Sequence, residues 1–330
     1  MKELKGTKIL LIALTEYSNG IITELQNMGA TVDYMCDKPN DGVICKTLGR
    51  LKWKPYIKVI EKYYNNKIKE YSANNYNYIL VIRGEYTPVT SVQALKKAFP
   101  KAQLILYMWD SIRNNKGIES KWSAYDKVWT FDRIDYLKYK QEIDFLPLFY
   151  YNSFLPEHTG KYKYDIAFIG TGHEDRVKII KGIKEQCKQY NLRMFEYIFL
   201  PHRLIYLKNK LKNKNYKGIT KKDIHFKLLP TKEAYKIYAK SRCVVDIESP
   251  TQCGLTMRTI EMIGLKKKLI TTNRDIVNYE FYNPSNIMVV DRRNFKIDPE
   301  FINKPYENIS DEIYQKYSLH NWILQVLGIK

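Results

Sequence analysis

Apolar segments that alternate with segments of helical spacing constrain the fold of this 330-residue chain most strongly. In the first 150 residues, runs such as Lys8–Leu14, Tyr78–Ile82 and Gln103–Tyr107 are apolar almost throughout. Strands of this kind are buried on both faces, as in a parallel sheet that is covered by helices. The first part of the chain therefore predicts an α/β domain built on a parallel sheet.

The same alternation starts again at Tyr164–Ile169 and continues through Leu192–Ile198, Cys243–Ile247 and Lys268–Thr272. Between the two runs, residues 147–163 contain prolines, a glycine and a polar, aromatic mixture that is typical of a linker. We expect an α/β protein of two Rossmann-like domains that face each other across a cleft, with ligands at the carboxyl ends of the strands. The predicted divisions are an acceptor domain over 1–152, a donor domain over 153–308, and a C-terminal helix over 309–330 that packs back on the first domain.

The net charge of +20 and the pI near 9.4 indicate an anionic partner. The most basic stretch is Arg203–Lys222, in which Lys208, Lys210, Lys212 and Lys214 nearly alternate. It is either a solvated loop or helix end, or a surface for anionic lipid head groups. A basic nucleic-acid-binding module is an alternative that rests on charge alone, without a recognised motif. We therefore expect no nucleic-acid partner.

Cysteine content and hydropathy limit the cellular compartments in which the protein is expected. The five cysteines are odd in number and include no Cys-x-x-Cys pair, which argues against a disulfide framework and a zinc ribbon. The apolar run Ile9–Leu14 is too short for a signal peptide, and no apolar stretch reaches the roughly 18 residues of a membrane span. We expect a cytoplasmic protein, peripheral to the inner face of the membrane.

A glycine-containing turn follows the first strand of the second half, in Phe168-Ile-Gly-Thr-Gly-His-Glu-Asp-Arg176. Such a turn brings backbone close to phosphate, and cationic side chains beside it suit a diphosphate. A dinucleotide fingerprint would need a third glycine at Asp175, so nicotinamide binding has only Glu196, about 20 residues downstream, in its favour. A tight turn with solvated polar residues is the other interpretation. The candidate ligands of phosphate are Gly170, Thr171, Gly172, His173 and Arg176.

The segment Asp246–Glu261 runs from an apolar strand through a polar loop into a short helix that carries Arg258 and Glu261. Backbone N–H groups at a helix start can face phosphate, and arginine adds a planar cationic clamp. Arg258 and Glu261 are three residues apart and share a helix face, where a surface ion pair is the alternative. Thr256 is a predicted N-cap, and Gly264 a predicted helix stop.

These motifs resemble the donor-binding half of GT-B-fold glycosyltransferases, closest to the group-1 and CgeB-like branches of bacterial surface-polysaccharide assembly. The motifs are Phe168-Ile-Gly-Thr with Arg176, Gly-Leu-Thr-Met-Arg-Thr-Ile-Glu-Met-Ile-Gly, and Lys268-Leu-Ile-Thr-Thr-Asn. The likeness covers about 165–295 and is architectural over 1–150. The family's Arg-x-Phe-Glu element corresponds to Arg258–Glu261, with Ile260 at the aromatic position.

The resemblance implies transfer of a sugar from a nucleotide-sugar donor to a hydroxyl of a lipid-linked surface glycan, such as lipopolysaccharide or capsule. It places Glu261 on the ribose, Arg258 on phosphate or sugar, and the backbone of Gly254, Leu255 and Thr256 on the diphosphate. Many retaining relatives carry a second glutamate at the position of Cys253. Glu248 or Gln252 could take that role, so retention or inversion stays open. A GT-B-fold nucleotide-sugar epimerase is the alternative enzyme.

No Asp-x-Asp pair occurs in the chain, whereas the other nucleotide-sugar transferase fold needs one for Mg²⁺ or Mn²⁺. We therefore expect no metal and no cofactor, with cations and a helix N-terminus stabilising the leaving diphosphate.

A general base should come from the first domain. Asp110, then Glu16, then Glu85 are the candidates, because each follows a predicted strand end; each could also be an ordinary loop acid. Arg83 and Arg113 are candidates for holding an anionic acceptor.

Overall fold

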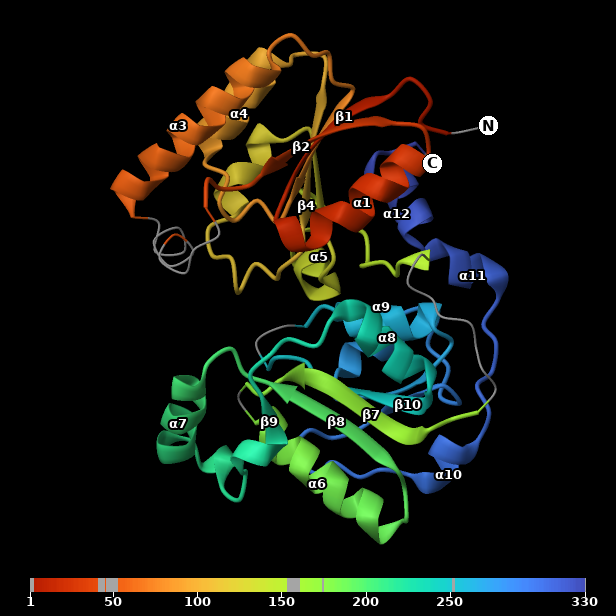
Figure 1. The fold of residues 1–330 in the computed structure, drawn as a ribbon. Helices are drawn as coiled ribbons and strands as arrows, with labels where there is room; N and C mark the ends of the chain where they lie inside the picture. Colours follow the sequence, from red (N-terminus) through yellow and green to blue (C-terminus); the bar gives the residue numbers. More distant parts are fainter. Residues whose placement is uncertain are drawn as a thin grey trace. The chain divides into compact units, whose positions relative to one another are not determined.

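The computed structural model describes residues 3–40, 45, 53–152, 161–173, 175–250 and 253–329, without the side chains of residues 15–17. The chain divides into two compact units (Figure 1). Unit 1 comprises Met1–Leu148, Thr251–Gly254 and Leu319–Lys330, and unit 2 comprises Phe149–Pro250 and Leu255–Ser318.

Unit 1 contains a six-stranded parallel sheet in the order β2-β1-β3-β4-β5-β6. The strands are β1 Lys8–Ala13, β2 Thr31–Cys36, β3 Tyr78–Ile82, β4 Gln103–Met108, β5 Lys127–Thr130 and β6 Asp144–Phe145. The helices of this unit are α1 Thr15–Asn27, α3 Lys54–Tyr71, α4 Val89–Ala98, α5 Arg133–Tyr139 and α12 Leu319–Val326. The central strands are apolar and almost wholly buried, as the sequence pattern predicts.

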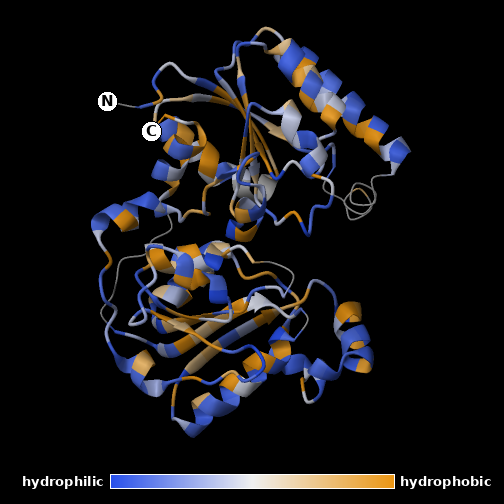
Figure 2. Ribbon diagram, turned by 180° about the vertical axis from the view of Figure 1, so that it is seen from behind, coloured by the Kyte–Doolittle hydropathy of each residue, from blue (hydrophilic) through white to orange (hydrophobic). Residues whose placement is uncertain are grey.

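Amphipathic spacing positions the helices against this sheet. In α3 the buried residues Tyr56, Ile60 and Tyr64 recur every fourth residue, so they lie on one face and join the sheet core. Figure 2 shows apolar strands inside each unit and helices in which hydrophilic and hydrophobic residues alternate along the ribbon.

The predicted C-terminal helix is wrong as a single element. It consists of α11 Asp311–Lys316 in unit 2 and α12 Leu319–Val326 in unit 1. The break has a packing cause, because Tyr317 is buried and its ring contacts Phe281 edge-on, at 4.9 Å between centroids. In α12, which lies beside α1 in Figure 1, Trp322 is buried and contacts the Tyr107 ring at 4.7 Å.

Unit 2 contains a second six-stranded parallel sheet, in the order β12-β11-β10-β7-β8-β9. The strands are β7 Tyr164–Thr171, β8 Met194–Phe199, β9 Ile224–His225, β10 Ser241–Asp246, β11 Lys268–Thr271 and β12 Ile287–Val289. The helices are α6 Arg176–Gln189, α7 Arg203–Lys212, α8 Thr231–Ala239, α9 Met257–Gly264, α10 Pro299–Asn303 and α11. Strands β7 and β10 pair directly with each other in parallel, so their carboxyl ends meet at one edge of this sheet.

The predicted linker is corrected over residues 149–151, while residues 153–160 lie outside the described residues. Phe149, Tyr150 and Tyr151 are buried, and the backbone N–H of Tyr150 donates to the carbonyl of Tyr317 at 2.9 Å. The aromatic part of this segment is therefore core of unit 2, because burying three aromatic rings outweighs the turn-forming signal of the neighbouring prolines.

Within the described part of the chain, no helix has the length and apolar character that crossing a membrane requires.

Candidate active site

A cavity of about 360 Å³ lies within unit 2, at the carboxyl ends of β7, β8 and β10. Five residues proposed from sequence line it, namely Gly170, Thr171, Arg176, Thr256 and Arg258. Its remaining lining includes Asp246 and Met257 and an apolar group made of Ile169, Tyr197, Phe199, Leu228 and Leu229. The two sequence motifs, about 80 residues apart, thus meet in one cavity because their strands are neighbours in the sheet.

The two glycines of the turn have different roles. A Cβ on Gly170 would lie 2.9 Å from the ring of Phe168 and 3.5 Å from Nη2 of Arg258, so a bare backbone keeps this side of the cavity open. A Cβ on Gly172 would lie 2.8 Å from Ile198, and the carbonyl of Gly172 accepts a hydrogen bond from the hydroxyl of Tyr216. Packing therefore requires both glycines, and Gly170 also lines the cavity.

Arg176 begins α6 and places its guanidinium beside the turn. Its Nη1 donates to Oγ1 of Thr171 at 2.9 Å, which fixes both polar side chains on the cavity wall. The N-terminus of this 14-residue helix adds its positive end to the same side of the cavity. His173 is exposed and lies outside the described lining.

Asp246, the last residue of β10, is the centre of a buried network that sequence reasoning missed. Its carboxylate is 1% exposed and accepts hydrogen bonds from Arg258 Nη1 at 2.9 Å, Thr256 Oγ1 at 2.7 Å and Thr259 Oγ1 at 2.9 Å. An acidic residue at the end of an apolar strand was the available signal, since a buried carboxylate requires partners.

Arg258 does not form an exposed surface ion pair with Glu261. Besides Asp246, it donates from Nε to the hydroxyl of Tyr238 at 3.1 Å, and its guanidinium lies 5.8 Å from the centre of the Phe168 ring. These partners hold the guanidinium at the cavity wall with only about a fifth of the side chain exposed. The site contains two arginines from different elements, both fixed by neighbouring side chains.

Thr256 is confirmed as the N-cap of α9. Its hydroxyl oxygen accepts from the backbone N–H of Thr259 at 3.3 Å while donating to Asp246, and the helix ends at Gly264 as predicted. The capping residue thereby joins the helix start to the end of β10.

Glu261 lies on the same helix but outside the cavity lining that the structure describes. Burial raises the pKa of its carboxyl group, an effect that Tyr235 and Arg258 oppose. The ribose-binding role remains a prediction for this residue.

Glu248 and Arg292 form a second polar group beyond β10. Glu248 is 9% exposed, accepts from the hydroxyl of Thr272, and lies 3.3 Å from Arg292 Nη1. Burial raises its pKa, whereas the Thr272 hydrogen bond and the Arg292 charge lower it. Arg292, also missed from sequence, contacts both oxygens of Asp175 at 2.9 and 2.6 Å. It therefore ties the start of α6 to the loop after β10.

The loop before α9 places its predicted residues differently. Gln252 lies outside the described residues, and Cys253 is exposed. The backbone N–H of Gly254 donates to the carboxylate of Asp132 at 3.0 Å, and Leu255 is buried. The N–H of Gly254 is therefore occupied by a hydrogen bond within unit 1. Of the predicted loop residues, Thr256 lines the cavity.

In unit 1 the candidate bases Glu85 and Asp110 share one cation. Arg83 Nη2 lies 2.9 Å from Glu85 and 3.6 Å from Asp110, at the carboxyl ends of β3 and β4. Arg83 has a φ of 73°, in the left-handed region that disfavours residues with a Cβ. A non-glycine residue held there is often part of a functional site. Arg113 is exposed.

Glu16 is not in a loop, because it belongs to the first turn of α1, which begins at Thr15. Its side chain lies outside the described residues. Two acids after β5 were missed instead, one at the N-cap of α5 and one in its first turn. Asp132 is buried and accepts from the hydroxyl of Ser111, and burial raises the pKa of Asp135 to about 6.

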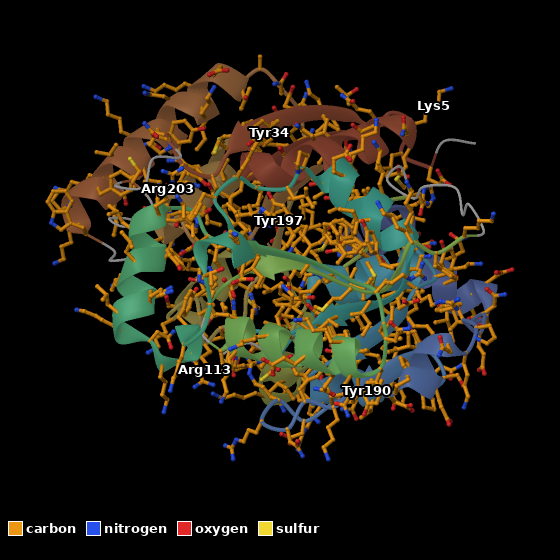
Figure 3. All side chains as sticks on the ribbon, turned by 60° about the horizontal axis from the view of Figure 1, so that its bottom comes forward. Lys5, Tyr34, Arg113, Tyr190, Tyr197 and Arg203 are labelled. Atoms are coloured by element: carbon orange, nitrogen blue, oxygen red, sulfur yellow. The ribbon has the colours of Figure 1, made fainter. Side chains whose placement is uncertain are left out.

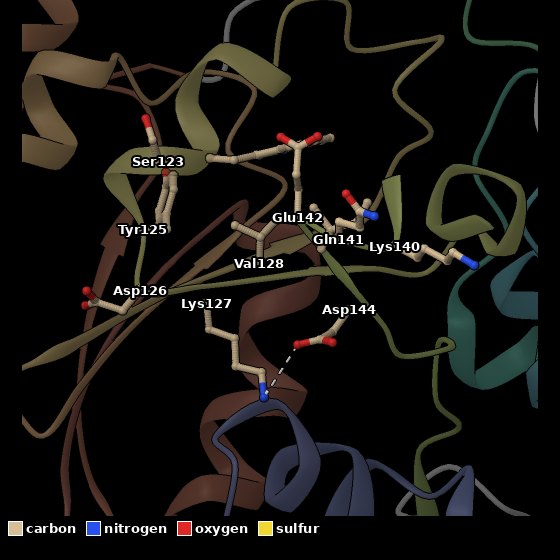
Figure 4. A pocket seen from close by; sticks show the side chains of 11 residues that line it. Ser123, Tyr125, Asp126, Lys127, Val128, Lys140, Gln141, Glu142 and Asp144 are labelled. Carbon is tan, nitrogen blue, oxygen red and sulfur yellow. Dashed lines mark ion pairs between the residues drawn. The ribbon is translucent and has the colours of Figure 1, made fainter. Parts of the chain in front are cut away.

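A larger cavity, of about 430 Å³, lies where β5 begins and is lined by Asp126, Lys127 and Asp144 among others (Figure 4). Lys127 Nζ lies 3.8 Å from Asp144. This cavity is at the amino ends of the strands, opposite the edge where parallel α/β sheets bind ligands, so we do not assign the site to it. Glu196 pairs with Lys184 beside another cavity, away from the glycine turn.

Among the described residues, no group of three or more histidine, cysteine or acidic side chains has the geometry of a metal site.

No protein-family model matches the chain, and no curated protein sequence matches it. Solved structures do match over nearly its whole length. The apo structure of OtsA has a TM-score of 0.64 at 10% identity, over 97% of this chain and 99% of that one. The lipopolysaccharide outer core galactosyltransferase WaaB has a TM-score of 0.53 at 12% identity, over 98% and 99%.

A third match is the UDP-GlcNAc 2-epimerase of Methanocaldococcus jannaschii, with a TM-score of 0.50 at 13% identity, over 98% and 100%. At such identities the likeness concerns the fold. Together with the two parallel sheets, it shows that this chain has the two-domain, Rossmann-like architecture of the GT-B fold.

Proposed function

We propose that the protein is a glycosyltransferase whose unit 2 cavity binds the diphosphate of a nucleotide-sugar donor. One observation carries the proposal: two arginines, Arg176 and Arg258, line a cavity at the carboxyl ends of neighbouring parallel strands. Planar guanidinium groups suit phosphate oxygens, and this edge of such a sheet is where nucleotides bind. The similar epimerase was solved with UDP-GlcNAc and UDP, and WaaB is named a galactosyltransferase, which supports a donor of this kind.

The geometry suggests separate roles for the lining residues. The backbone at Gly170 and Thr171, the start of α6 and the two arginines would contact the diphosphate and stabilise its charge as the sugar leaves. The aromatic and leucine side chains of Tyr197, Phe199 and Leu228 offer an apolar wall for the nucleoside. Glu261 is proposed for the ribose and Glu248 for the sugar. Because cations supply the stabilisation, we propose that transfer needs no metal and no cofactor.

We propose that the acceptor hydroxyl is deprotonated by a carboxylate of unit 1. Asp110 ranks first, followed by Glu16 and Glu85, and Arg83 would hold Asp110 and Glu85 in place. The acceptor proposed is a lipid-linked surface glycan such as lipopolysaccharide or capsule, because the chain carries a net charge of +20 and such acceptors bear phosphate.

The test is a donor panel. The purified protein is incubated with UDP-, GDP-, ADP- and dTDP-sugars, with and without EDTA, and released nucleotide is measured. Slow hydrolysis of one donor, insensitive to EDTA and abolished by Arg176→Ala, is the expected result. Absence of both binding and turnover for every donor would contradict the proposal.

A nucleotide-sugar epimerase is the second candidate, favoured by the fold likeness to the UDP-GlcNAc 2-epimerase. The two activities differ in what accumulates without an acceptor. An epimerase converts the donor into an isomeric nucleotide sugar, whereas a transferase releases free nucleotide and sugar.

A further inference from the structure

Helix α7 exposes a row of leucines on the surface of unit 2. Leu204 is 77% exposed, Leu207 53% and Leu211 85%. Spacings of three and four residues place all three on one face of the helix. Tyr206, at 7% exposure, is on the opposite face. A contiguous apolar row on the outside of a helix marks an interaction surface, whereas isolated exposed leucines are ordinary.

The helix is fixed by its other face. The hydroxyl of Tyr206 donates to the carbonyl of Ile219 at 3.4 Å, and Lys210 Nζ donates to the same carbonyl at 2.8 Å. Tyr206 belongs to the core cluster of unit 2, against which Ile205 is packed. The leucine row is therefore presented by a helix that is already packed.

Cations flank the row. Arg203, Lys208 and Lys212 are exposed residues of α7, and Figure 3 labels Arg203 at its first turn. Over residues 203–222 the chain carries one arginine, seven lysines and no acidic residue. None of these cations has an ion-pair partner among the side chains that the structure describes.

We propose that α7 docks on a membrane surface that contains anionic lipids. The leucine row enters the boundary between head groups and acyl chains, and the lysines contact lipid phosphates. An apolar face bordered by lysine and arginine is the arrangement of interfacial amphipathic helices. Basic side chains close to an anionic leaflet add an electrostatic attraction, and this attraction weakens as the salt concentration rises.

Charge and hydrophobicity together select this occupant. The phosphates of a nucleic acid could bind the cations, but they would make no favourable contact with three exposed leucines. A second copy of this chain would bring another row of lysines against the first, and like charges repel. The surface does not depend on the proposed function, because it lies outside the candidate active site.

Vesicle sedimentation tests the proposal on the whole chain. Wild type is expected to pellet with phosphatidylcholine vesicles that contain phosphatidylglycerol, and to remain in solution with phosphatidylcholine alone. The triple variant Leu204→Ser, Leu207→Ser, Leu211→Ser should partition about tenfold more weakly or worse, since apolar burial contributes to interfacial binding. Changing Lys208 and Lys212 to Gln should weaken binding and reduce its salt dependence.

Leu137→Ser is the matched control, because Leu137 is 49% exposed on α5 in unit 1, and it should bind as wild type does. Circular dichroism and thermal unfolding confirm that each variant is folded. Equal pelleting of the triple variant and wild type would overturn the proposal. So would failure of wild type to bind anionic vesicles, or a leucine-dependent dimer in place of vesicle binding.

Discussion

Arg258 donates to the buried carboxylate of Asp246 at 2.9 Å, across the gap between the start of α9 and the end of β10. The same carboxylate binds the hydroxyls of Thr256 and Thr259, so the N-terminal turn of α9 is fixed to the strand. Arg258 is thus held at the cavity wall by protein contacts alone. Such preorganisation lowers the cost of binding an anionic ligand there.

Replacing Asp246 with Asn should destabilise the fold. The change leaves the largely buried guanidinium of Arg258 without a counter-charge, and removing one partner of a buried pair costs about 3 kcal/mol. The free energy of unfolding, measured by denaturant titration, checks this. Asp291→Asn is the control, because the Asp291–Arg274 pair is exposed and such pairs contribute about 1 kcal/mol or less. Equal losses in the two variants would contradict the account of Asp246.

Arg292 should act as a positioning residue, because it joins Asp175 at the start of α6 to Glu248. Arg292→Ala is expected to weaken nucleotide binding about tenfold, by loosening the helix start that faces the cavity. Arg292→Lys should recover part of the affinity, since it restores the charge without the bidentate contact. Calorimetric titration measures both. A full recovery by lysine would show that only charge matters.

Two helical glycines should respond to alanine in opposite directions. A Cβ on Gly264 would lie 2.6 Å from Cγ of Tyr150, which is buried, so Gly264→Ala should cost about 2 kcal/mol of stability. Gly182 in α6 has nothing within 4 Å of an added Cβ, so Gly182→Ala should add about 0.5–1 kcal/mol. Thermal unfolding ranks the three proteins, and a stabilising effect of Gly264→Ala would contradict the expected clash with Tyr150.

Asp135 should make stability depend on pH between about 4 and 6. Burial raises the pKa of its carboxyl group to about 6 from an ordinary value of 3.8, so the folded state binds this proton more tightly than the unfolded state. Its contribution is present in full below pH 4 and is lost as the pH rises through 6. Asp135→Asn removes that loss, which we expect to be about 1 kcal/mol because the group is partly solvated. Unfolding titrations at pH 4 and 7 measure the difference, and parallel profiles for the two proteins would contradict it.

The sequence predicted the strands of both sheets well because buried parallel strands are continuously apolar. A glycine turn and an arginine on a short helix are local signals, so the sequence also singled out Gly170, Arg176 and Arg258, which line one cavity of unit 2. It missed Asp246 and Arg292, because their importance depends on partners elsewhere in the chain.

The prediction of a linker around Tyr150 was wrong because the aromatic residues there are buried. Proline and glycine nearby indicate a linker, but burial of the ring depends on Tyr314 and Gly264, more than 100 residues away. The break between α11 and α12 is invisible in sequence for the same reason, because it depends on where Tyr317 packs.

Nucleotide binding to wild type and Arg176→Ala tests the central claim most directly. Calorimetric titration with UDP, GDP, ADP and dTDP should find one nucleoside diphosphate that binds wild type, and Arg176→Ala should weaken it about tenfold or more, as expected for a charge-assisted contact. Lys178→Ala, an exposed residue of the same helix, should bind as wild type does. Tight binding that is unchanged by Arg176→Ala would contradict the assignment of the diphosphate to this cavity.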